Sequence, residues 1–220
     1  MKNLIQLPVL FENDFCIVLN KPSGLAVQGG EGIKHSLDSI LSQSIHPRPF
    51  LVHRLDRDTS GLILVAKTKE AAAAFSALFA GKEGLVKIYL GICSGIPSQS
   101  EGLISLDLEI KGKPKGSKKS MTIYRLLSSG ELDGFPCSQL ELELGTGRMH
   151  QIRRHLALIR HPLLGDDKYG NFSLNKKLKK SVGLKNLLLH ANRLVIPPMP
   201  CLPAGLEISA PPPEYFPSFT

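Results

Sequence analysis

The chain has 220 residues, of which 42% are apolar and 21% charged, and its formal net charge is +8. This composition is typical of a globular protein and excludes a disordered or fibrous one, and no apolar run approaches the roughly 18 residues of a membrane-spanning helix. We recognise no signal peptide, because no small-residue cleavage site follows the first apolar stretch. The four scattered cysteines form no CxxC pair, which argues against a zinc site or a disulfide framework and favours a reducing cytoplasm.

The first half of the chain predicts strands around one helix. Residues 69–82 include a run of four alanines, with Thr68 as a possible N-cap and Gly81 as a terminator, and they predict a helix. Residues 23–30 predict a glycine-containing turn. Compact apolar runs bounded by glycine or proline predict strands over residues 15–22, 61–68 and 85–95.

The second half predicts half-exposed strands and one amphipathic helix. Ile152, Leu156 and Ile159 recur at helical spacing within residues 150–160, and Pro162 ends that pattern. The proline-rich segments 196–205 and 210–216 predict extended chain. Alternating apolar and polar residues predict strands over residues 103–112, 120–127 and 138–147. We therefore expect an α+β fold with a mixed, mainly antiparallel sheet and flanking helices, rather than a parallel α/β fold.

Positive charge is concentrated in two segments. Residues 111–125 contain six Lys and Arg and no acidic residue, and residues 148–180 contain nine against two aspartates. The rest of the chain is net negative, so the segregation predicts a polyanionic partner, with RNA or DNA favoured over a membrane surface. The lysine runs Lys111–Lys119 and Lys176–Lys180 are expected to contact phosphates, although either run alone could be a solvated loop.

The segment "HRLDRDTSGL", residues 53–62, places a dense polar cluster directly before an apolar strand. Asp58, Thr59 and Ser60 suit a turn, because their short side chains bond to nearby backbone groups. The remaining charges need another explanation. A metal site is not expected, since His150 and His155 are five residues apart on the predicted helix, which is off the spacing that brings two ligands together.

Six ordered segments of the chain resemble the motifs of the RluA-type pseudouridine synthases. These segments are "NKPSGLAV", "HRLDRDTSGLILVAKT", "KIYLGICSG", "GTGRMHQIRRHL", "HPLLGDDKYG" and "LLLHANRL". The resemblance implies a pseudouridine synthase fold with a central RNA-binding cleft. It also implies one catalytic domain over residues 1–220, without the family's frequent N-terminal S4 domain, since the first motif begins about twenty residues into the chain.

The resemblance implies an isomerase that converts uridine to pseudouridine in RNA without a metal or cofactor. Asp56 occupies the position of the family's nucleophile, a role open to a carboxylate. Arg153 is expected to pair with that carboxylate, because its planar fork suits bidentate binding. Tyr89 is expected to stack on the extracted base, and Arg54 to fill the space that the flipped base leaves.

The implied partner is a structured RNA, either a 23S rRNA or a tRNA stem-loop, bound by a monomer in the cytoplasm. The sequence leaves open which uridine is modified and whether the nucleophile attacks uracil C6 or ribose C1′. The residues expected to contact RNA besides the catalytic set are Arg54, Arg57, Arg148, His150, Gln151 and Arg154.

Two other functions have partial support in the sequence. "HRLD" and "VAK" resemble kinase motifs, but their order is wrong and no glycine-rich loop or DFG motif is present. A catalytically silent RNA-binding or ribosome-assembly protein on the same fold is the alternative, and the presence of Asp56, Tyr89 and Arg153 weakens it.

Overall fold

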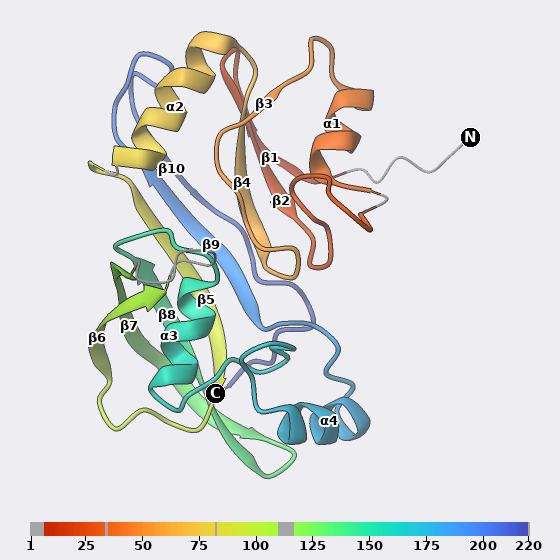
Figure 1. The fold of residues 1–220 in the computed structure, drawn as a ribbon, viewed down its shortest axis with the longest axis vertical. Helices are drawn as coiled ribbons and strands as arrows, with labels where there is room; N and C mark the ends of the chain where they lie inside the picture. The colour runs from red at the N-terminus through yellow and green to blue at the C-terminus, as the bar shows by residue number, and fades with distance from the viewer. Residues whose placement is uncertain (1–6, 34, 82, 110–116, 220) are drawn as a thin grey trace. The chain divides into compact units, whose positions relative to one another are not determined.

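The computed structural model describes residues 7–33, 35–81, 83–109 and 117–219, and the side chains of 107–109 and 117–119 fall outside this description. The chain divides into two compact units, and each is built from segments distant in sequence (Figure 1). Unit 1 contains residues 1–87 and 190–212, and unit 2 contains residues 88–189 and 213–220. The single catalytic domain expected over residues 1–220 stays a prediction.

Unit 1 is built on a sheet with the strand order β1-β2-β4-β9, in which β3 pairs with β4 and β10 with β9. The pairs in this unit are antiparallel, except that β4 runs parallel to β9 at Ser60 and Gly61, which face His190 and Ala191. Every residue of β4 is buried, as its continuous apolar sequence predicts. The strands are β1 (Val9–Glu12), β2 (Cys16–Lys21), β3 (Phe50–Leu51), β4 (Ser60–Ala66), β9 (Leu189–Ile196) and β10 (Leu206–Ser209).

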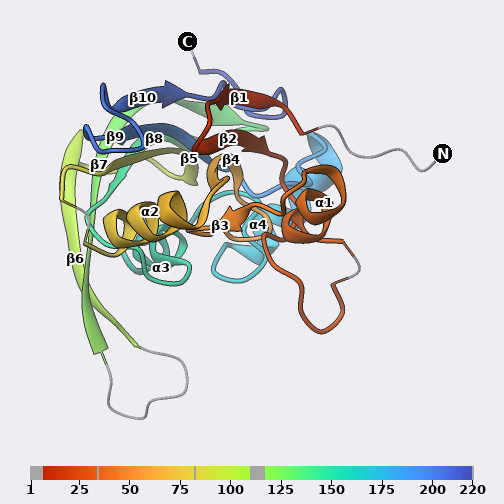
Figure 2. The same cartoon turned by 90° about the horizontal axis from the view of Figure 1, so that it is seen from above.

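Helices α1 (Leu37–Ser44) and α2 (Lys69–Gly81) lie on the same side of the unit 1 strands (Figure 2). Helix α2 begins at Lys69, as the sequence predicts, and ends at Gly81, while Lys82 lies outside the described residues. Its N-cap is confirmed, because the Thr68 hydroxyl oxygen accepts a hydrogen bond from the Ala71 N–H at 3.1 Å. Helix α1 was not predicted. It begins with a capping box in which Ser36 and Ser39 bond reciprocally to each other's backbone N–H.

Unit 2 contains an antiparallel sheet with the order β5-β8-β7-β6. Helix α3 (Gln151–Leu158) packs on β6 and β7 (Figure 1). Strand β7 is longer than the predicted strand over residues 120–127 and extends beyond it at both ends. The strands are β5 (Val86–Ser94), β6 (Glu101–Glu109), β7 (Ser117–Leu132) and β8 (Phe135–Leu144).

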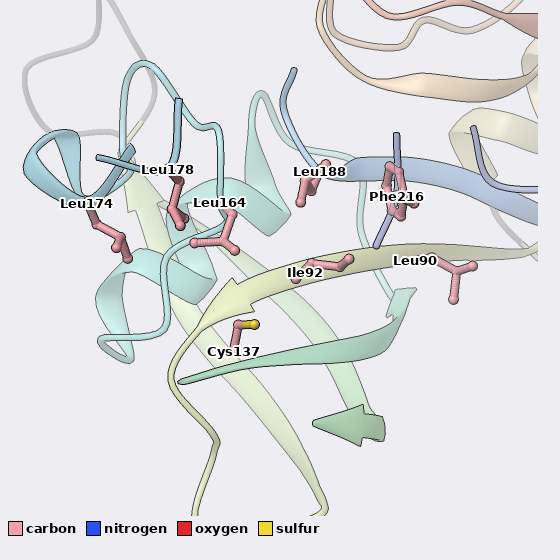
Figure 3. Close-up of a cluster of buried hydrophobic side chains, with 8 residues drawn as sticks. All are labelled: Leu90, Ile92, Cys137, Leu164, Leu174, Leu178, Leu188 and Phe216. Atoms are coloured by element: carbon pink, nitrogen blue, oxygen red, sulfur yellow. The ribbon is translucent and has the colours of Figure 1, made fainter. Parts of the chain in front are cut away.

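Helix α4 (Phe172–Ser181) completes unit 2, and it contains the lysine run that sequence reasoning treated only as a basic segment. Asn171 caps the helix by accepting a hydrogen bond from the Leu174 N–H at 3.0 Å. Leu174 and Leu178, one turn apart, enter the core of the unit (Figure 3). The core cluster contains Leu90, Ile92, Cys137, Leu164, Leu174, Leu178, Leu188 and Phe216.

The predicted fold class is confirmed: the protein has a mixed, mainly antiparallel arrangement of strands with four helices in the described residues. The proline-rich ending is less extended than predicted, since β9 and β10 bracket residues 197–205 and pair with each other. None of the helices in the described part of the chain has the length and apolar character needed to cross a membrane.

Gly61 is required where β4 meets β9. Its φ is +108°, and a Cβ at this position would lie 2.3 Å from the Ala191 carbonyl oxygen. Gly24 has a φ of +85° but no atom within 4 Å of its Cβ position, so it provides a matched control.

We expect Gly61→Ala to lower the free energy of unfolding by more than Gly24→Ala. Gly24→Ala adds only the backbone strain of about 1–2 kcal/mol, whereas Gly61→Ala adds a clash with the backbone of β9 as well. Urea denaturation of both variants measures the difference. Equal losses would mean that β9 yields to the added methyl group.

Candidate active site

The Asp56 segment forms a tight turn in unit 1, directly before β4. The Thr59 N–H donates to the Asp56 carbonyl oxygen at 3.2 Å, which closes the turn. The neighbouring turn after β2 holds this segment in two places, because the Gly24 N–H donates to Arg57 O at 2.9 Å and the Ser23 hydroxyl donates to Asp58 O at 2.8 Å. The backbone that carries the half-buried Asp56 side chain is therefore fixed.

Lys21 is the cation beneath this turn. Its side chain is fully buried, and Nζ donates to the carbonyl oxygens of Pro22, Leu25 and Arg57 at 3.0, 2.8 and 2.9 Å. Burial lowers the pKa of Lys21 to about 8, against the opposing effect of the Asp58 and Asp56 charges. Three carbonyl acceptors match the three protons of an ammonium group, so Lys21 is a cation at pH 7.

His53 fixes the other end of the segment. Its ring stacks on Phe79 of α2 with centroids 4.1 Å apart, and Nε2 accepts a hydrogen bond from the Leu64 N–H at 2.9 Å. Burial, together with the nearby Lys87 charge, lowers the pKa of His53 to about 3. A neutral imidazole that accepts from the backbone of β4 has a structural role.

Behind the turn, β4 is tied to the last part of unit 1 by a buried histidine. The Ser60 hydroxyl lies 2.9 Å from His190 Nδ1, and His190 Nε2 lies 3.1 Å from the Ala210 carbonyl oxygen. Because a carbonyl only accepts, Nε2 carries the proton and Nδ1 accepts from Ser60. Burial lowers the pKa of His190, in keeping with this neutral form.

In unit 2, Arg153 of α3 forms a buried ion pair. Its Nε and Nη2 donate to the two carboxylate oxygens of Asp166 at 2.8 and 2.7 Å, and Nη2 also donates to Asp167 at 3.0 Å. Both Arg153 and Asp166 are almost fully buried. The fork-to-fork geometry fixes the plane of the guanidinium.

Asp166 also organises the loop between α3 and α4. Its Oδ1 accepts from the backbone N–H groups of Lys168 and Tyr169 at 2.8 and 2.9 Å. Burial acts to raise the pKa of Asp166, but the hydrogen bonds from Arg153, Tyr169 and Lys168 outweigh it, and its pKa lies below the normal value. The Tyr169 ring in turn lies 5.4 Å from the Arg153 guanidinium, and its hydroxyl lies 3.1 Å from His150 Nδ1.

The loop before α3 is held by Gln151. Its Oε1 accepts from the Thr146 hydroxyl and from the Arg148 N–H, while Nε2 donates to Met121 O and Thr122 Oγ1 at 2.8 and 3.1 Å. Gln151 is buried with its hydrogen-bonding groups occupied within the protein, so it shapes the loop, and its predicted contact with RNA stays a prediction.

A chain of buried hydrogen bonds joins α3 to β7. The Ser120 hydroxyl donates to Leu106 O at 2.6 Å, so it accepts from His155 Nε2, 2.9 Å away. His155 Nδ1 then accepts from the Thr122 hydroxyl at 2.9 Å. Burial is the first cause that lowers the pKa of His155, and the Arg154 charge adds to it. His155 is thus a neutral structural group.

The predicted site residues fall in both units. Asp56, Arg54 and Arg57 belong to unit 1, where Arg54 is exposed and Arg57 forms an exposed ion pair with Asp58 at 2.9 Å. Tyr89 lies on β5 of unit 2 opposite Leu142, with 9% of its surface exposed.

Around α3 the side chains differ in exposure: Arg148 is exposed, His150 and Arg154 are half-buried, and Gln151 and Arg153 are buried. The ion pair between Asp56 and Arg153 stays a prediction, as does the base-stacking role of Tyr89. The lysines of Lys111–Lys119 lie outside the residues whose side chains the structure describes.

Lys21 and Asp166 lie within the motif segments, but no sequence pattern assigns them a role. A lysine just before Pro22 and an aspartate after Gly165 are common surface residues, so only their burial distinguishes them. The signal that could have found Asp166 is the pair of acidic residues in "GDDKYG", close to an arginine that needs an anion once it is buried.

Comparison with known proteins identifies the family. Residues 15–158 match the family model described as RNA pseudouridylate synthase, so the chain belongs to this family, as the motif resemblance predicted. Ribosomal large subunit pseudouridine synthase C of Rickettsia bellii is 38% identical over 205 residues, which cover 86% of this chain and 63% of that protein. The chain thus spans less than two thirds of the length of this relative.

A second relative matches over most of its length. tRNA pseudouridine synthase C of Vibrio vulnificus is 32% identical, and the match covers 86% of this chain and 84% of that protein. Among solved structures, human RNA pseudouridylate synthase domain containing 1 has a TM-score of 0.76 at 25% identity, covering 96% of this chain and 85% of the other.

We expect Asp166→Asn to destabilise the protein by about 3–5 kcal/mol, because it leaves the Arg153 charge buried without its main anion. Asp167→Asn is the matched control, since the Asp167 side chain is 69% exposed, and it should change the free energy of unfolding by no more than about 0.5 kcal/mol. Chemical denaturation at pH 7 measures both. Similar small losses in the two variants would contradict the structural role of the Arg153–Asp166 pair.

Stability should also fall as the pH drops below about 6.5, the pKa of histidine in an unfolded chain. The pKa of His155 is lowered in the folded protein, so the unfolded chain takes up the proton first and the stability present above pH 6.5 is lost in acid. We expect His155→Gln to be less stable at pH 7 but to lose less on going from pH 7 to pH 5. An unchanged pH dependence, measured by urea denaturation, would mean that His155 is protonated in the folded state.

Proposed function

We propose that the protein is an RNA pseudouridine synthase. In this reaction the N1–C1′ bond of a uridine breaks, a C5–C1′ bond forms, C5 loses a proton and N1 gains one. The observation that supports the proposal is the family match over residues 15–158, which spans the motifs of Asp56, Tyr89 and Arg153.

Asp56 is the proposed nucleophile. The turn that carries it is fixed by hydrogen bonds to residues 23 and 24, which suits a group that must meet one atom of a flipped base. The Lys21 ammonium and the Asp56 charge attract one another, so a buried cation lies near the proposed nucleophile.

Arg153 and Tyr89 are the proposed partners of Asp56. The guanidinium of Arg153 is oriented by Asp166 before any substrate arrives, which lowers the cost of ordering it during catalysis. Tyr89 is a nearly buried aromatic ring on β5, and a base that leaves an RNA stack can pack against an aromatic ring.

The proposed RNA contacts are the cationic side chains Arg54, Arg57, Arg148 and Arg154, with the half-buried His150. The names of the relatives point to ribosomal RNA and to tRNA, so we propose a uridine in a stem-loop of one of these RNAs. We also propose that the protein acts as a monomer in the cytoplasm without a small-molecule cofactor, as the family resemblance implies.

Tritium release from RNA labelled at uridine C5 tests the proposal, because the C5 proton passes to water. The wild-type protein should release tritium from labelled total rRNA or tRNA that is prepared from a strain without this protein, because the target uridine is then unmodified. Asp56→Asn should release none while its affinity for the same RNA stays within a few-fold, because the substitution keeps the size of the side chain and removes the nucleophile.

Turnover by Asp56→Asn would remove this residue from the nucleophilic role. RNA binding by the wild-type protein without any tritium release would support the alternative, a catalytically silent RNA-binding protein.

A further inference from the structure

Helix α4 has an outer face that no part of the site described above uses. On a helix that turns by 100° per residue, its first residue and three of its lysines fall within an arc of roughly 100°. Leu174 and Leu178 lie on the opposite side and enter the core of unit 2 (Figure 3). The residues of this outer face, all of them exposed, are Phe172, Lys176, Lys179 and Lys180.

The charge of this region is of one sign. Residues 168–188 contain six lysines and no acidic residue. Lys176, Lys179 and Lys180 have no carboxylate neighbour on their own helix, so no charge of α4 offsets the positive potential that attracts an external anion. Lys177 differs, because it lies at the edge of the face with its ammonium 5.4 Å from the Phe135 ring centroid.

Phe172 is the unusual member of the face. It is the first residue of α4 and 61% of its surface is exposed, more than for any other large apolar side chain described. An aromatic ring among lysines is the combination by which proteins bind unpaired nucleotides, since the ring stacks on a base and the cations bind the phosphates around it.

We propose that this face of α4 binds an unpaired segment of the RNA substrate outside the target uridine, with Phe172 stacked on a base and Lys176, Lys179 and Lys180 on the phosphates. This inference rests on the proposed function for the identity of the polyanion. It adds that the substrate carries unpaired nucleotides where it meets α4.

The face is fixed relative to Arg153. Asn175 of α4 donates from Nδ2 to the Asp166 carbonyl oxygen at 2.9 Å and accepts from the Gly165 N–H at 3.0 Å. The carboxylate of the same Asp166 holds Arg153. RNA bound at α4 is therefore held at a defined place with respect to the proposed catalytic arginine, within one compact unit.

A lipid surface does not fit this helix. Amphipathic helices that bind membranes insert their apolar face, whereas the apolar face of α4 is already buried against the core of unit 2. The outer face offers a single aromatic ring, which suits one base better than an acyl layer.

Binding of two synthetic RNAs tests the proposal. One is a hairpin with an unpaired loop, and the other is a fully paired duplex of equal length. The affinity of the protein for each RNA is measured by fluorescence anisotropy over a range of KCl concentrations. Replacing Lys176, Lys179 and Lys180 together by Gln should reduce the slope of log K against log[KCl] by about two for both RNAs. The control Lys177→Gln should change the slope by less than the Gln substitution of any one of these three lysines.

Phe172→Ala should weaken binding of the hairpin about tenfold without changing its salt slope, because it removes stacking and no charge. Phe172→Tyr should restore the affinity, and the duplex should bind equally well with either side chain. Thermal melting of each variant should match the wild-type protein, since these side chains are exposed.

Unchanged affinity and salt slope in the triple lysine variant would overturn the proposal, as would equal effects of Phe172→Ala on hairpin and duplex. Tritium release at saturating RNA should stay at the wild-type rate in all of these variants. If the wild-type protein released no tritium, the proposed function would fail, while the two binding assays would still decide whether α4 binds RNA.

Discussion

The buried ion pair between Arg153 and Asp166 is the interaction on which the organisation of unit 2 depends most. The two opposite charges compensate each other in the protein interior, where an unpaired charge of either group would cost several kcal/mol. The same carboxylate receives two backbone N–H groups of the following turn. One aspartate therefore fixes a helix, a loop and the plane of the guanidinium at once.

Unit 1 solves a similar problem with a cation. Lys21 donates to three carbonyl oxygens from two segments of the chain and so ties these segments together around the turn that carries Asp56. In both units a buried charge holds backbone groups in place next to a proposed catalytic residue. Rigidity at these points comes from electrostatics, whereas the surrounding strands supply the apolar packing.

The parts of the fold that follow local rules could be predicted from the sequence. Helix α2 and the strand at residues 16–21 have strong periodicity and clear end signals, and both were found within one or two residues. Helix α4 was missed because its lysines obscured the spacing of Leu174 and Leu178 behind the Asn171 cap.

The site residues could be named from the motifs, but their partners could not. That Arg153 pairs with Asp166, or that Lys21 is buried, depends on tertiary contacts that leave no local pattern.

The parallel contact of β4 with β9 has a consequence for the order of events during synthesis. Ser60 and Gly61 find His190 and Ala191 only after about 130 further residues have been added, and the whole of unit 2 up to Leu189 is made in between. Until β9 is synthesised, the segment of the proposed nucleophile is followed by a β4 that lacks one neighbouring strand. The backbone N–H and C=O groups of β4 that face β9 are then unpaired, and its apolar side chains are partly exposed. The proposed nucleophile is encoded early in the chain, yet its supporting strand is completed among the last.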